Sequence, residues 1–294
     1  MAKARQIDNL DCDASVAAAA SEVLRVRFDE ILEFQAAAIE PNNINGVHDM
    51  RVASRRFRSA LKDFKPIFEK RALKPLKTNV KEIGDALGDV RDQDVSIEAL
   101  ESLRERSPNE RIASGIDLLI DSRHSQRSDA HAELIKQLPA DRLTRLHSDL
   151  ESLNRTGLQN ADSQTFRSFA VTAIEGALEK FLDRSKSIYD PLNDKALHKL
   201  RLSAKRLRYA LELFNQCWEG ELKPFAKHLS KIQSALGHVH DSSEWLDYLS
   251  QTIRKNDGLD SQTASWLISE FVSLRTDEYL KGLELWNEWI ATDL

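Results

Sequence analysis

VHDMRVASRRFR, residues 47–58, and LHKLRLSAKRLR, residues 197–208, are two versions of one segment. His, Arg, Arg or Lys, Arg and Arg stand at matching positions in both, 150 residues apart. Repeats that build helical arrays return after roughly 20 to 50 residues. An offset of this length instead predicts that half of a domain has been duplicated.

Both segments are predicted to be amphipathic helices, because neither contains Gly or Pro and their apolar residues recur every three or four positions. These apolar positions are Val47, Met50, Phe57, Leu61, Phe64 and Phe68, and Leu197, Leu200, Ala204, Leu207, Leu211 and Phe214. One position further along runs a basic stripe: His48, Arg51, Arg55, Arg58 and Lys62 in the first helix, and His198, Arg201, Lys205 and Arg208 in the second. Like charges at this spacing repel each other, so each stripe predicts a compensating negative ligand.

The positive charge is concentrated in two parts of an otherwise acidic chain. Residues 47–81 contain eleven Lys and Arg against three acidic residues, and residues 195–231 contain nine against three. The whole chain of 294 residues carries a formal net charge of −5. Two focused basic regions on an acidic background favour attraction of a polyanion over non-specific binding.

The sequence also predicts the compartment. Cys12 and Cys217 lie far apart and form no CxxC pair, so they are expected to be free thiols that complete no metal motif. No run approaches the roughly 18 apolar residues of a membrane helix, and acidic residues follow the N-terminus in place of a signal-peptide core. We therefore expect a cytoplasmic protein without a membrane segment, metal or cofactor.

The chain is predicted to be helical throughout, with no convincing strand. The expected helices of the first half cover about 14–39, 47–68, 72–88, 92–104, 109–137 and 140–153; those of the second half cover 164–188, 194–218, 221–236, 241–256 and 261–289. Asn43 and Asn193 are candidate N-caps of the two motif helices, and Asp92 and Asp241 are expected to cap the helices that follow them.

A polar segment, residues 154–163, is the expected linker between a first half (1–153) and a second half (164–294) of one domain. The predicted fold is all-α: two antiparallel four-helix bundles, related by a pseudo-twofold axis that the internal duplication creates.

The chain resembles the CHAD family, the conserved histidine α-helical domain. The resemblance rests on the two His-x-x-Arg-x-x-x-[Arg/Lys]-Arg-x-Arg helices, on an expected turn Leu87-Gly88-x-x-Arg91-Asp92-x-Asp94, and on its weaker echo Leu236-Gly237-x-x-His240-Asp241. It implies two four-helix bundles and a basic groove or channel between the halves that binds inorganic polyphosphate, without catalytic activity. It also implies association with polyphosphate granules.

The candidate ligand contacts combine the two stripes, the arginines beside them and two lysine rows on the next helices. They are His48, Arg51, Arg55, Arg56, Arg58, Lys62, Lys74, Lys77, Lys81, His198, Arg201, Lys205, Arg206, Arg208, Lys223, Lys227 and Lys231. Arginine suits phosphate oxygens because its planar fork can donate two parallel hydrogen bonds.

Three alternatives remain at this point. A nucleic acid such as RNA could occupy the basic surface, although single-strand binding normally uses aromatic side chains for base stacking. A metal-dependent phosphohydrolase could use His48 and Asp49, but the second segment reads His198-Lys199, so the Asp is not repeated. An acidic protein could also dock there. No residue is assigned a catalytic role.

Overall fold

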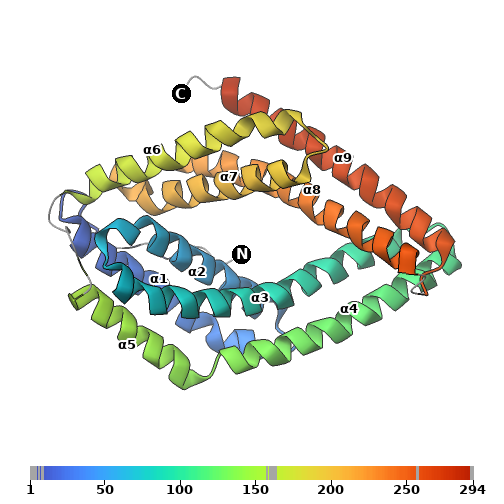
Figure 1. Cartoon of the computed structure of the whole chain (residues 1–294), viewed down its shortest axis with the longest axis horizontal. Helices are drawn as coiled ribbons and strands as arrows, with labels where there is room; N and C mark the ends of the chain where they lie inside the picture. The colour runs from blue at the N-terminus through green and yellow to red at the C-terminus, as the bar shows by residue number, and fades with distance from the viewer. Residues whose placement is uncertain are drawn as a thin grey trace. The chain divides into compact units, whose positions relative to one another are not determined.

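In this computed structural model, which describes residues 5, 7, 10–156, 158, 164–255 and 258–291, the chain is all-α (Figure 1). Within those ranges there are nine α-helices and no strand beyond two isolated bridges, Ser15 with Thr165 and Phe68 with Leu158. The helices are α1 (Val16–Ile39), α2 (Ile44–Asp63), α3 (Lys70–Glu105), α4 (Glu110–Gln137), α5 (Ala140–Thr156), α6 (Phe166–Ser185), α7 (Asp194–Phe214), α8 (Lys223–Lys255) and α9 (Ser261–Ala291). Short 3-10 helices cover Lys65–Ile67, Lys186–Tyr189 and Asn215–Trp218.

The helices belong to two compact units. Unit 1 consists of Met1–Leu100 and Ile120–Val171, and unit 2 consists of Glu101–Leu119 and Thr172–Leu294. In unit 1, α1 packs along α2 and contacts α5; in unit 2, α8 packs against both α7 and α9. The predicted linker at 154–163 begins in the last turn of α5 and lies mostly outside the described residues, and the predicted halves and duplication stay predictions.

The motif helix α2 forms in the predicted place, but it begins at Ile44 and ends at Asp63 and not at the predicted residues 47 and 68. Asn43 caps it, since its side-chain oxygen accepts a hydrogen bond of 2.9 Å from the backbone N–H of Gly46. The six apolar positions of the stripe are all buried, and Phe57 meets Phe28 of α1 edge to face at 5.4 Å between ring centroids. A fully buried side chain of this size stabilises the fold by about 1.5–3 kcal/mol, so the apolar stripe fixes which face of α2 remains for the cations.

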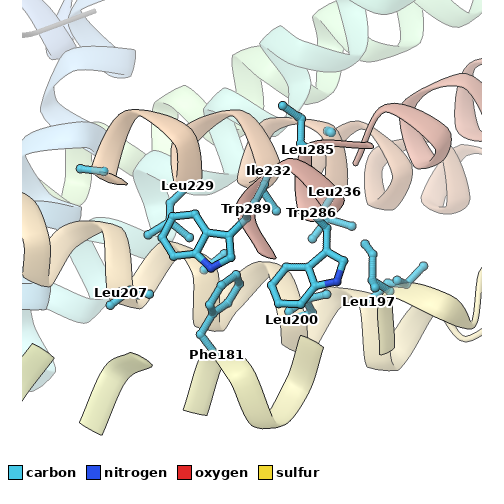
Figure 2. Close-up of a cluster of buried hydrophobic side chains, with 14 of the residues drawn as sticks. Phe181, Leu197, Leu200, Leu207, Leu229, Ile232, Leu236, Leu285, Trp286 and Trp289 are labelled. Atoms are coloured by element: carbon cyan, nitrogen blue, oxygen red, sulfur yellow. The ribbon is translucent and has the colours of Figure 1, made fainter. Parts of the chain in front are cut away.

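In unit 2, α7 is likewise capped by an asparagine and buries its apolar face. Asn193 accepts a hydrogen bond of 3.2 Å from the backbone N–H of Ala196. The apolar face of α7 packs in the cluster shown in Figure 2. There the ring of Phe181 lies between two tryptophans, with ring-centroid distances of 5.7 Å to Trp286 and 5.9 Å to Trp289. The other labelled members come from α7, α8 and α9: Leu197, Leu200, Leu207, Leu229, Ile232, Leu236 and Leu285.

An arginine holds the start of each motif helix. Arg127 on α4 donates to the backbone oxygen of Pro41 at 2.8 Å and to the buried carboxylate of Asp94 on α3 at 2.5 Å. Arg275 on α9 donates to the backbone oxygen of Pro191 at 2.6 Å, and also to Asp194 at 2.6 Å. Each guanidinium therefore ties the turn before α2 or α7 to the rest of its unit.

The prediction that helices end near residues 84–88 and at residue 236 is wrong. α3 and α8 continue without interruption, so Asp92 and Asp241 lie inside helices and do not act as N-caps. The expected turn beginning at Leu87-Gly88 is helical for the same reason. Gly84, one turn of α3 earlier, marks the close approach of an arginine, because a Cβ built on it would lie 2.6 Å from Nη1 of Arg58.

The prediction of free thiols is also wrong, because Cys12 and Cys217 are both disulfide-bonded. Spacing in the sequence does not determine the oxidation state of a cysteine. Disulfides persist mainly in oxidising compartments, so the thiol argument no longer supports a cytoplasmic location, which stays a prediction. Within the described residues, no helix combines the length and the apolar character needed to cross a membrane.

Candidate anion-binding site

The two basic stripes have the same degree of burial. His48, Arg51, Arg55, Arg56 and Arg58 on α2 are half-buried, as are His198, Arg201, Lys205, Arg206 and Arg208 on α7. Lys62, at the end of the first stripe, is exposed. An ordinary surface face holds its charged groups in water. Half-burial at all ten matching positions therefore distinguishes these stripes from a solvated helix face.

One arginine of each stripe lies against a glycine of the neighbouring helix. A Cβ built on Gly88 of α3 would be 3.9 Å from Nε of Arg51, and a Cβ on Gly237 of α8 would be 3.4 Å from Nε of Arg201. Both are ordinary van der Waals distances, so each guanidinium packs against the neighbouring helix at its glycine. The resulting arrangement is the same in the two units.

Each stripe begins with a histidine beside a second cationic or titratable group. Burial lowers the pKa of His48, and Arg91 on α3 and Arg51 lower it further, against the opposing effect of Asp49. Burial also lowers the pKa of His198, with added contributions from His240, Arg201 and Lys205. Both imidazoles are therefore neutral at pH 7 and can donate or accept one hydrogen bond at each nitrogen according to tautomer.

The His198 site in unit 2 contains a second imidazole. The ring of His240 on α8 lies 4.3 Å from that of His198, centroid to centroid, where α3 carries Arg91 in unit 1. Nδ1 of His198 is buried and, among the described residues, has no hydrogen-bond partner. A buried polar atom in this state carries a desolvation penalty of about 1–3 kcal/mol, which a ligand oxygen or a water can relieve.

The first stripe faces a row of carboxylates on α3. Arg51 donates to Asp92 at 3.2 Å between Nη2 and Oδ1, and Nη1 of Arg58 lies 3.7 Å from Oδ1 of Asp85. Asp89 stands between these two aspartates in sequence. Its pKa is raised, first by burial and then by the charges of Asp92 and Asp85.

The second stripe has a different set of partners. Nη1 of Arg208 lies 3.4 Å from Oε1 of Glu212 on the same helix and 3.5 Å from Oγ of Ser230 on α8. Its guanidinium carbon is 4.6 Å from the ring centroid of the buried Tyr209, a cation–π contact. Among the described residues, no carboxylate lies within ion-pair distance of Arg201.

The two predicted lysine rows are exposed throughout. They comprise Lys74, Lys77 and Lys81 on α3, and Lys223, Lys227 and Lys231 on α8. Among the described residues, a contact joins the first row to its stripe: Nζ of Lys81 is 2.5 Å from Oδ2 of Asp85, the carboxylate that also faces Arg58. The structure thus brings Lys81 to the stripe through a shared aspartate, while the ligand role of all six lysines stays a prediction.

Sequence reasoning gave no ligand role to Arg91, His240 or the α3 aspartates. The available signal was that Arg91 and His240 stand three residues after the matching glycines, Gly88 and Gly237. The sequence analysis took those glycines as helix ends and therefore missed this signal. A side chain in a turn, unlike one in a continuous helix, cannot be assigned to a helix face by its spacing. The aspartates had no signal of their own.

Metal-ligand geometry does not arise in the described part of the chain. No group of three or more His, Cys, Asp or Glu side chains there is placed to hold a metal ion. His238 pairs with Glu278 at 3.1 Å and His240 with Glu244 at 3.4 Å. These histidine contacts are each made with a single carboxylate.

Comparison with known proteins identifies the fold and the family. The profile of the CHAD domain matches residues 22–250. Two solved structures share the fold: the CHAD domain from the plant Ricinus communis (TM-score 0.73, 22% identity, 95% of each chain covered) and PptA from Streptomyces chartreusis (TM-score 0.72, 15% identity, 93% of this chain and 100% of the other). No curated protein matches the sequence.

This all-α chain, with a basic stripe on one helix of each unit, belongs to the CHAD domain family. The family profile spans both motif helices, from within α1 to the last turns of α8. The resemblance found in the sequence is thereby confirmed at the level of family and fold.

Proposed function

We propose that this protein binds inorganic polyphosphate along the basic stripes of α2 and α7 and does not act on it chemically. The observation that carries the proposal is the matched pair of half-buried cationic faces. In each, an arginine lies against a helix glycine and a neutral histidine lies near a second cationic or titratable group. The CHAD resemblance implies the same ligand.

The chemistry of the stripes fits a linear phosphate polymer. Successive members of a stripe are three or four residues apart, which places them about 5 Å from one another along the helix axis. Arginine forks can each take two phosphate oxygens. The orphaned Nδ1 of His198 adds one polar atom that can pair with a phosphate oxygen or a water.

Nucleic acid is the weaker candidate because the nearby aromatic side chains are already buried. Phe57, Phe64 and Phe68 are at most 3% exposed, and Tyr209 is 8% exposed and covered by Arg208. Bases normally stack on accessible aromatic rings in single-strand binding proteins. A ligand made only of phosphate requires no such platform.

Calorimetric titration with polyphosphate of defined length tests the proposal. The double variant Arg51→Gln and Arg201→Gln should lose affinity by tenfold or more, since hydrogen bonds to charged groups contribute about 1.5–3 kcal/mol each. Arg145→Gln is the matched control, because Arg145 is an exposed arginine paired with Asp141 on α5. Equal affinities for the double variant and the control would refute the proposal.

Two further measurements separate the alternatives. RNA supplied at equal phosphate concentration should compete poorly at physiological salt; equal competition would favour a general polyanion binder. Incubation of polyphosphate with the protein and divalent cations should release no phosphate, whereas release that the double variant abolishes would assign a hydrolase. The channel between the halves, a granule location and the cytoplasmic compartment stay predictions.

A further inference from the structure

His240 of α8 lies at the start of the basic stripe on α7, within unit 2. Its ring centroid is 4.3 Å from that of His198, the first residue of the stripe. Gly237 stands three residues before His240, which places both on one side of α8. A Cβ built on Gly237 would be 3.4 Å from Nε of Arg201, so this side of α8 faces the stripe.

The free protein disfavours a proton on His198. Burial lowers the pKa of His198, and the nearby His240 lowers it further, as do Arg201 and Lys205. Nδ1 of His198 is buried and has no hydrogen-bond partner among the described residues, so a protonated ring would hold one N–H without an acceptor. An anion bound at this place reverses the balance, because its charge favours protonated rings.

The acidic groups around the two histidines belong to α7, α8 and α9. Nε2 of His240 is 3.4 Å from Oε1 of Glu244, one turn further along α8, and the side chain of Glu244 is 69% exposed. A phosphate group can replace a carboxylate that is so open to solvent. The other charged groups are engaged in contacts of their own: Asp194 with Arg275 of α9, Glu278 of α9 with His238, and Arg184 of α6 with the backbone oxygen of Lys199.

The position of His240 carries a permanent charge in unit 1. Arg91 stands three residues after Gly88, as His240 stands three residues after Gly237. Arg91 likewise lowers the pKa of the first histidine of its stripe, His48. Arginine stays charged at every pH at which a protein works, whereas histidine gains its charge near pH 6.5. The same place therefore holds a fixed cation in unit 1 and a proton-dependent one in unit 2.

We propose that His240 is a phosphate-binding residue of unit 2, and that it acts with His198 as a pair that takes up a proton when a phosphate group binds. The inference rests on the proposed function, because it assigns a residue and a pH response to the α7 stripe. Binding and protonation are linked in both directions, so the affinity of this segment for polyphosphate rises as the pH falls. One proton taken up changes the affinity by at most about tenfold per pH unit.

Two substitutions at His240 separate a ligand contact from a structural role. His240→Gln removes the titratable group and keeps a hydrogen-bonding side chain, whereas His240→Arg supplies the fixed charge that Arg91 supplies in unit 1. His238→Gln is the matched control, since His238 lies on another side of α8 and pairs with a single carboxylate, as His240 does. Calorimetry measures the affinity for polyphosphate of defined length at about pH 6 and about pH 7.5, on either side of the ordinary pKa of histidine.

The gain in affinity on lowering the pH should be about three- to tenfold smaller in His240→Gln than in the wild type and in His238→Gln. His240→Arg should lose the same part of the pH dependence. At the higher pH it should bind about two- to fivefold more tightly than the wild type, which is the effect of one solvent-exposed charge pair. Contributions from His48 and from the ligand's own terminal phosphates are common to all four chains and cancel in the comparison.

An equal pH dependence in His240→Gln and His238→Gln would overturn the inference. It is also overturned if His240→Arg binds no more tightly than the wild type at the higher pH, since that result would indicate a structural role. If circular dichroism shows that His240→Gln does not fold, His240→Arg alone decides, by its pH dependence and its affinity. A wild-type chain that binds polyphosphate at neither pH would instead overturn the proposed function itself.

Discussion

Replacing Arg127 with Met should destabilise unit 1 more than the matching change, Arg275→Met, destabilises unit 2. Arg127 pairs with Asp94, whose side chain is 1% exposed, whereas Arg275 pairs with Asp194, whose side chain is 49% exposed. Met keeps much of the apolar stem of arginine and removes the charge. The two variants thus differ mainly in what they leave behind: a buried carboxylate in one case and a solvated one in the other.

The magnitudes follow from that burial. An uncompensated buried charge costs about 3–5 kcal/mol; Nη1 of Arg91, 3.9 Å from Oδ2 of Asp94, can compensate part of it, so we expect a loss near 3 kcal/mol. Arg275→Met leaves the oxygen of Pro191 and the hydroxyl of Ser243 without one donor. Losses of this kind cost about 1–2 kcal/mol.

Hydrogen exchange measured together with urea unfolding is the suitable assay, because a chain of two units need not unfold in one step. Arg127→Met should speed exchange at the amides of α1 and α2, and adding Asp94→Asn should restore part of the loss by removing the buried charge. Equal losses for the two methionine variants, or no recovery in the double variant, would show that the argument from burial is wrong.

Three further outcomes follow from the same structure. Polyphosphate should bind more tightly as the pH falls below 6.5. The pKa values of His48 and His198 are lowered in the free protein and a bound anion raises them again, so the complex takes up protons. Replacing either histidine with Asn should flatten the dependence of affinity on pH. The pKa of Asp260, about 2 beside Arg111, should return toward its ordinary 3.8 in Arg111→Gln, as carbon-detected NMR titration can show. Thiol alkylation under denaturing conditions should label neither cysteine before reduction and both afterwards.

The sequence predicted the motif helices well because local rules decide them. Asn43 and Asn193 act as N-caps, and every apolar residue of the stripes is buried, as spacing alone indicated. The ends of the helices away from the motifs were harder to predict. Gly84 and Gly88 look like breaks in a sequence, but in the structure they admit arginines of the adjacent helix.

The candidate site was predictable on one helix and not across two. Periodicity along α2 identifies which cations share a face, and the structure finds them half-buried together. It cannot identify that Asp85 and Asp92 oppose those cations, because their register depends on how α3 packs against α2. The same limit applies to His240, whose ring meets His198 only through the packing of α8 on α7.

Gly84 shows where stability and the proposed phosphate binding conflict in this fold. A glycine inside a helix destabilises the helix by about 0.5–1 kcal/mol relative to alanine. Replacing such a glycine with alanine is therefore a common way to raise thermal stability. Here the added methyl group would arrive 2.6 Å from Nη1 of Arg58, so the guanidinium would have to move. A variant that melts at a higher temperature would be gained at this position by displacing an arginine to which we assign a role in phosphate binding.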